Sequence, residues 1–136
     1  MANYKISDIE GIGTVYAEKL KAVGVASVNS LLEKGGTKKG RKELAEKTKI
    51  DESLILKWVN SADLFRVPGI GTEYSELLER AGVDTAKELK SRKPENLHAK
   101  LVEVNAQKKL VRLVPSLSAV QKWIEEASKL EAKVTY

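Results

Sequence analysis

Apolar residues recur along this chain three or four positions apart, and glycine, proline or capping residues divide the pattern into short stretches. This spacing places the apolar side chains on one face of an α-helix. No stretch alternates between apolar and polar residues in the way that a half-buried strand does. We therefore predict an all-α fold with about eight or nine short helices.

Residues that favour helix starts and stops give the approximate limits of these helices. Ser7-x-x-Glu10 and Thr85-x-x-Glu88 have the form of a capping box, in which a hydroxyl and a carboxylate each accept a backbone amide proton at a helix start. The other predicted helices cover about 14–23, about 41–48 and about 72–81, and begin after Ser27, after Asp51, at Pro94, and after Ser116 or Ser118.

The chain also contains an internal repeat with an offset of 58 residues. Ile9-Glu10-Gly11-Ile12-Gly13-Thr14 returns as Val67-Pro68-Gly69-Ile70-Gly71-Thr72, and further positions such as Tyr16 and Tyr74 match at the same offset. Such a repeat predicts two units, over residues 1–66 and 67–136, packed together as one compact protein. We expect the second unit to carry about twelve additional residues near 105–114 and a short C-terminal tail.

The repeated Gly-Ile-Gly sequence predicts a tight turn between two helices. Glycine permits positive φ angles and close approach of the backbone, and the isoleucine between the glycines can fill the gap between the helices. Ala17 and Ser75, four residues after the second glycine of each turn, are small enough for close helix packing. Each copy thus follows the pattern hydrophobic-x-Gly-hydrophobic-Gly-x-x-x-Ala/Ser-x-x-Leu-x-x-x-Gly-Val.

This pattern resembles the helix-hairpin-helix family, and the whole chain resembles an uncharacterised family with two helix-hairpin-helix units, labelled a domain of unknown function. The resemblance implies two tandem units of about four short helices each. It also implies that hairpin amides bind a DNA phosphate at the positive end of the following helix, a contact that reads no sequence. The implied phosphate-binding residues are Gly11, Ile12, Gly13 and Thr14 in the first hairpin, and Gly69, Ile70, Gly71 and Thr72 in the second.

The two hairpins differ in the charge that follows the glycines. DNA-binding members of the helix-hairpin-helix family often carry Lys or Arg at the second position after Gly-x-Gly, where this chain has Val15 and Glu73. A carboxylate at this position repels phosphate, and Glu76 and Glu79 add further negative charge. The first hairpin is therefore the better candidate, and the alternative for both is a turn used only for packing.

The most basic segment of the chain covers residues 34–42, where five cations occur without an acid in nine residues. We predict a glycine-rich loop here, with Lys38, Lys39, Arg41 and Lys42 binding phosphates. Five such contacts give a log–log salt slope of roughly −4 to −5. The alternative is a solvated loop without a ligand.

Composition favours a soluble protein without metal or redox chemistry. The formal net charge is +5, the chain has no cysteine, and no apolar stretch approaches the length of a membrane span. Because cysteine is absent and the N-terminus lacks a signal-peptide pattern, we expect a cytoplasmic location. His98 is the only histidine, and we find neither a catalytic constellation nor a metal site, so we predict no enzyme activity and no cofactor.

The sequence therefore predicts a sequence-independent nucleic-acid-binding protein that prefers double-stranded DNA. The alternative is a protein-interaction or scaffold module, whose partner is another protein. Trp58 and Trp123 occupy matching apolar stripes, so we predict core packing for them and not base stacking. We expect Tyr16 and Tyr74 to be partly buried supports near the hairpins.

Overall fold

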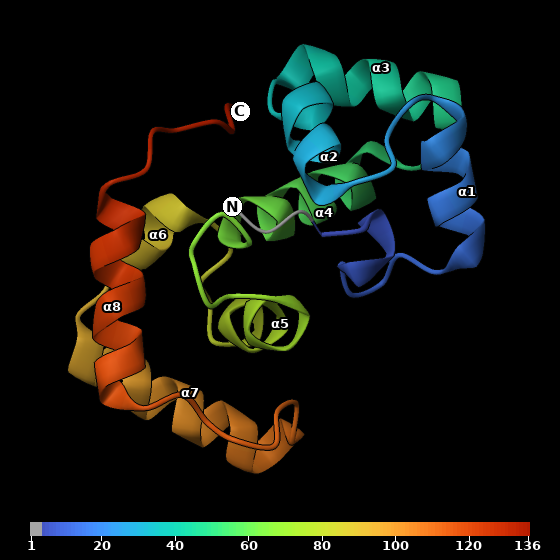
Figure 1. The fold of residues 1–136 in the computed structure, drawn as a ribbon. Coiled ribbons are helices and arrows are strands. Elements are labelled where there is room, and N and C mark those ends of the chain that lie inside the picture. The colour runs from blue at the N-terminus through green and yellow to red at the C-terminus, as the bar shows by residue number, and fades with distance from the viewer. Residues whose placement is uncertain (1–3) are drawn as a thin grey trace. The chain divides into compact units, whose positions relative to one another are not determined.

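In a computed structural model, the structure describes residues 4–136, and their regular structure is helical (Figure 1). This confirms the predicted all-α fold; within these residues the only strand-like feature is an isolated bridge between Lys5 and Ser27. The elements are a 3-10 helix η1 (Ile6–Asp8), α1 (Thr14–Ala22), α2 (Val28–Gly35), α3 (Lys38–Thr48), α4 (Glu52–Leu64), α5 (Thr72–Arg80), α6 (Ala86–Lys90), α7 (Pro94–Lys108) and α8 (Leu117–Ser128).

The chain divides into two compact units. Unit 1 contains the residues up to Asp63 together with 132–136, and unit 2 contains 64–131. The division after Asp63 lies close to the predicted one at 66. The C-terminal tail is predicted to belong to the second unit, but residues 132–136 belong to unit 1. The Thr135 amide donates to the Gly36 carbonyl of that unit at 2.8 Å.

The backbone repeats the same turn at the predicted offset. Gly11 and Gly69 both have φ of +93°, a conformation that glycine adopts without steric cost. The amide of Ile12 donates to the Ile9 carbonyl, and that of Ile70 donates to the Val67 carbonyl. After α1 and α5, second glycines with positive φ, Gly24 and Gly82, end the helices. The internal repeat is thus a repeat of three-dimensional structure.

The second unit is longer than the first, and its additional residues lie both before and after Lys109, the position that matches Lys49. Lys49 and Lys109 end α3 and α7 in the left-handed conformation and stand 60 residues apart. Trp58 and Trp123, on α4 and α8, stand 65 apart, whereas the hairpins stand 58 apart. The second unit therefore carries fewer additional residues than the twelve expected, and most of them lie in the irregular segment 109–116.

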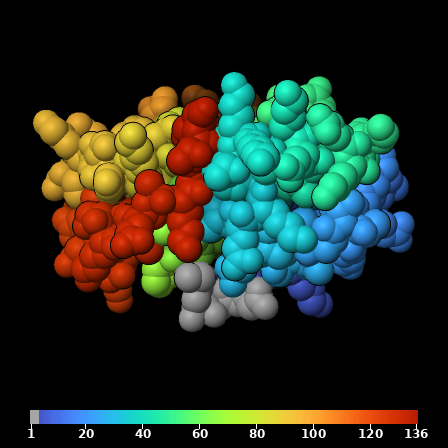
Figure 2. All heavy atoms as spheres, turned by 90° about the horizontal axis from the view of Figure 1, so that it is seen from above, coloured from blue at the N-terminus to red at the C-terminus, as the bar shows by residue number. Residues whose placement is uncertain are grey.

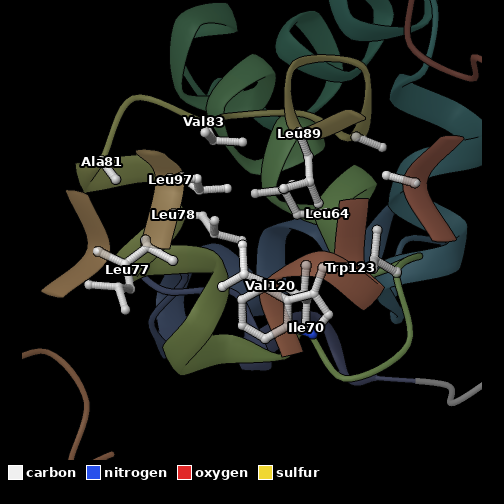
Figure 3. Close-up of a cluster of buried hydrophobic side chains, with 14 of the residues drawn as sticks. Leu64, Ile70, Leu77, Leu78, Ala81, Val83, Leu89, Leu97, Val120 and Trp123 are labelled. Atoms are coloured by element: carbon white, nitrogen blue, oxygen red, sulfur yellow. The ribbon is translucent and has the colours of Figure 1, made fainter. Parts of the chain in front are cut away.

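Each unit has its own hydrophobic core, and each core contains a tryptophan whose indole nitrogen lies close to the first glycine of the hairpin. Trp58 and Trp123 are buried, and their rings lie 5.1 and 5.2 Å from those of the half-buried Tyr16 and Tyr74. This confirms the packing role predicted for all four. In unit 2, the tryptophan lies among aliphatic side chains from several helices (Figure 3), including Leu64, Ile70, Leu77, Leu78, Leu89, Leu97 and Val120.

Several helix starts confirm the sequence pattern. Ser27, Thr85 and Ser116 each accept an amide proton three residues ahead through the side chain. Asp51 accepts from the Ser53 amide and hydroxyl, and these two hydrogen bonds lower the pKa of its carboxyl. The box predicted at Ser7 and Glu10 is wrong, since at η1 the Asp8 carboxylate accepts the Lys5 amide proton at 3.0 Å.

The predicted basic loop is also wrong, because most of it is helical. α2 continues to Gly35, and α3 begins at Lys38. Thr37 caps α3 by accepting the Gly40 amide proton at 3.0 Å. Glycine in this segment serves close packing, since a Cβ on Gly40 would overlap the Lys34 carbonyl. The lysines of this segment therefore lie on an ordered helical turn.

Candidate nucleic-acid interface

The first hairpin presents backbone amides at the start of α1. The side chain of Ile12 is buried, so the turn directs its polar backbone outward, and Gly11, Gly13 and Thr14 are exposed. The amides of these three residues have no protein acceptor among residues 4–136. The Ile12 amide, in contrast, is bonded to the Ile9 carbonyl, as is that of Ile70 to Val67. The predicted phosphate contact is therefore wrong for Ile12 and Ile70.

Gly13 leaves the first turn of α1 without a side-chain cap. Its φ and ψ of −84° and −174° are accessible to any residue, and a Cβ built on it meets nothing within 4 Å. Ser, Thr, Asp or Asn at this position would satisfy one of the first amides. The helices that begin after Ser27, Thr37, Thr85 and Ser116 have such caps. At α1 the open amides and the helix dipole favour an anion.

A groove of about 330 Å³ lies beside these amides. Its lining includes Ser7, Gly13, Thr14, Glu18 and Lys21. Lys21 brings a cation to the groove, and sequence reasoning missed this residue. The signal was its spacing, since positions 14, 18 and 21 share one face of a helix.

The second hairpin has the same turn but a less open setting. Gly69 is exposed, whereas Gly71 and Thr72 are only partly exposed. The side chain of Glu73 is exposed in the first turn of α5, where the first hairpin has Val15. The Tyr74 hydroxyl donates to the Leu113 carbonyl at 3.1 Å, so the segment 109–116 lies against this helix. The charge and exposure of the second hairpin are less favourable for phosphate.

The predicted basic cluster divides into an exposed and a buried part. Lys38, Lys39 and Lys42 are exposed on the first turns of α3. Arg41 is only 3% exposed, and its guanidinium donates to the carbonyls of Gly35, Gly36 and Thr135. The predicted phosphate contact is therefore wrong for Arg41, whose hydrogen bonds hold the backbone together. Lys34, the remaining cation, donates to the Val23 carbonyl at the end of α1.

The two candidate surfaces of unit 1 are separate. Figure 1 places the turn before α1 and the start of α3, which follows α2, at different ends of this unit. The groove beside Gly13 accordingly contains no residue of α3. The structure therefore groups Gly11, Gly13 and Thr14 with Lys21, and groups the α3 lysines with one another.

The described residues offer little else for site chemistry. No group of three or more His, Asp or Glu side chains within residues 4–136 could hold a metal ion. Within the same range, no helix combines the length and the apolar character that crossing a bilayer requires. Among the described residues, the candidate site therefore consists of exposed backbone amides, the lysines named above and Glu18.

Comparison with known proteins places the chain in a family. The family model described as "Domain of unknown function (DUF4332)" matches residues 10–130. The chain belongs to the DUF4332 family. The DUF4332 match covers both glycine turns and ends before residues 132–136. No curated protein and no solved structure matches the chain.

Proposed function

We propose that this DUF4332 protein binds nucleic acid without reading its sequence, prefers double-stranded DNA, and catalyses no reaction. The observation that carries the proposal is the uncapped, exposed start of α1, where Gly11, Gly13 and Thr14 offer amides that have no acceptor in the described part of the protein. In this proposal both glycine turns are helix-hairpin-helix turns, and the protein acts in the cytoplasm.

The chemistry of a phosphate suits this turn. Amide protons at a helix start donate to phosphate oxygens, and the helix dipole adds partial positive charge at the same point. Gly13 has no side chain to obstruct the approach. Because phosphates are alike on every nucleotide, a contact of this kind fixes position without specifying sequence.

Cationic side chains add a nonspecific electrostatic contribution. Lys21 lies in the groove beside the turn and can pair with a neighbouring phosphate. The three exposed lysines of α3 form a second cationic surface, which can contact a different part of a long duplex. If these three lysines pair with phosphates, they contribute about −3 to the log–log salt slope.

The proposal is tested by fluorescence anisotropy of a labelled random-sequence duplex at several salt concentrations. We expect saturable binding that weakens steeply with salt. Replacing Lys21 with Ala should lower the affinity several-fold, whereas Lys19→Ala on the same exposed helix should have a smaller effect, because Lys19 does not line the groove. A variant with Lys38, Lys39 and Lys42→Ala should flatten the salt dependence.

Two outcomes contradict the proposal. The first is no binding at low salt, which favours the alternative of a protein-interaction module. The second is binding that Lys19→Ala and Lys21→Ala weaken equally, because a response to net charge alone assigns no role to the groove.

A further inference from the structure

Residues 132–136, here called the strap, cross the α2–α3 corner of unit 1. Figure 2 shows the end of the chain, in dark red, lying against the cyan residues of this corner. The Thr135 amide donates to the Gly36 carbonyl at 2.8 Å, and the Thr135 carbonyl accepts from the Arg41 guanidinium at 2.6 Å. Both backbone groups of Thr135 are thus bonded to the corner, the amide to a backbone carbonyl and the carbonyl to an arginine side chain.

The corner is shaped for a peptide backbone. A Cβ on Gly36 would stand 2.5 Å from the Lys133 carbonyl oxygen, so only glycine lets the strap pass at this distance. Arg41 is held in place by the carbonyls of Gly35 and Gly36, at 3.0 and 3.1 Å, with a further donor directed at Thr135. A buried guanidinium with fixed geometry is suited to binding a peptide carbonyl.

A side chain of the strap provides a contact that depends on sequence. The Tyr136 hydroxyl donates to Asn60 Oδ1 at 2.9 Å, and the Arg41 guanidinium carbon lies 5.7 Å from the centre of the tyrosine ring. A groove of about 380 Å³ beside this ring is lined by Lys38, Arg41, Glu52, Ser53, Leu56 and Tyr136. The ring itself is 66% exposed, so it rests on the surface without entering the core.

We propose that the α2–α3 corner is a binding site for an extended peptide carrying a tyrosine, and that the strap is its reversible resident ligand. The strap is held by hydrogen bonds, one surface ring and the partly buried Val134, and none of its residues is fully buried, as expected for a ligand on a surface site. This inference does not rest on the nucleic-acid proposal, because it uses neither hairpin; Lys38 alone belongs both to this groove and to the exposed lysines of α3.

Occupancy of the corner by the strap sets an upper limit on the dissociation constant of the same peptide when it is free. A tethered segment acts at an effective concentration of about 1 mM. A strap that occupies its site most of the time must therefore bind as a free peptide with a dissociation constant at or below about 1 mM. This value is measurable by NMR.

The test uses the full chain with Thr135→Pro and Tyr136→Ala, which removes the amide donor and the ring of the resident strap. The probe is an acetylated and amidated peptide with the sequence of residues 131–136. We expect saturable shifts at Gly36, Arg41 and Asn60 with a dissociation constant below about 1 mM. The unsubstituted chain should bind more weakly, by about twofold for a dissociation constant of about 1 mM and by about tenfold for one of about 0.1 mM, because its own strap competes. Asn60→Ala in the opened chain should weaken binding several-fold.

The control probe carries Pro at the position of Thr135 and should not bind. The inference is overturned if the opened chain, folded by circular dichroism, shows no saturable shift at several millimolar probe. It is also overturned if both probes bind equally, or if the unsubstituted chain binds as well as the opened one. Hydrogen exchange of the unsubstituted chain gives a second test, since a Thr135 amide that exchanges at the unfolded rate contradicts the bonded strap.

Discussion

At the scale of single residues, the two glycines of the first turn have different roles although they stand two positions apart. Gly11 is required by the backbone, because its φ is +93°; a Cβ there would make an ordinary contact with the indole nitrogen of Trp58, at 3.6 Å. Gly13 has an ordinary backbone conformation and open space around it. The fold does not need glycine at position 13. The absence of a side chain there is better explained by the access that it gives an anion to the backbone amides.

This difference predicts opposite responses in stability. Gly11→Ala should lower the free energy of unfolding by about 1–3 kcal/mol, because alanine is strained at positive φ. Gly13→Ser should leave it unchanged or raise it by a few tenths of a kcal/mol, because serine is a good helix cap. Chemical denaturation measures both values. Equal destabilisation by the two substitutions would show that the roles assigned here are wrong.

At the scale of elements, the sequence predicts much of the fold because its signals are local. The glycine turns, the hydroxyl caps and the apolar spacing each act within a few residues, and the helices begin close to where these signals place them. The capping-box pattern failed at Ser7, where the short η1 is closed by Lys5 and Asp8. Two carboxylates, those of Asp8 and Glu10, occur within three residues of Ser7, and the spacing alone does not decide which of them accepts an amide proton.

The basic segment shows where local signals are insufficient. Two adjacent glycines and many charges suggested a loop, but Gly35 and Gly36 are buried, and Thr37 starts a helix at once. The Arg41 guanidinium donates to the carbonyl of Thr135, which lies 94 residues away in the sequence. No local pattern indicates such a contact, so the sequence could not distinguish a buried arginine from a phosphate-binding one.

The cap of α3 can be tested directly. Thr37→Ala should lower the free energy of unfolding by about 1 kcal/mol, because the Gly40 amide loses its side-chain acceptor. Thr37→Ser keeps the hydroxyl and should retain most of the stability. Thermal and urea denaturation of the two variants measure the effect. If alanine and serine are equivalent at this position, the segment behaves as the loop that the sequence suggested.

At the scale of the whole molecule, the chain contains two copies of one backbone plan that have diverged in surface chemistry. Both copies keep the glycine with φ of +93° and the tyrosine against the tryptophan. In the first copy, the exposed amides lie beside a groove whose lining includes Lys21 and Glu18. The second has Glu73 and a partly covered turn. The shared features maintain the fold, and the features that differ are the reason why we propose phosphate binding at the first hairpin.

The most direct test of this assignment compares Gly13→Ser with the matched substitution Gly71→Ser in duplex binding at low salt. Serine at position 13 adds a side chain where the phosphate would approach and supplies an acceptor for the open amides. We predict that Gly13→Ser weakens binding at least tenfold without loss of stability, and that Gly71→Ser changes it less than threefold. Undiminished binding by Gly13→Ser, or equal losses from both variants, would contradict a phosphate site at the first hairpin.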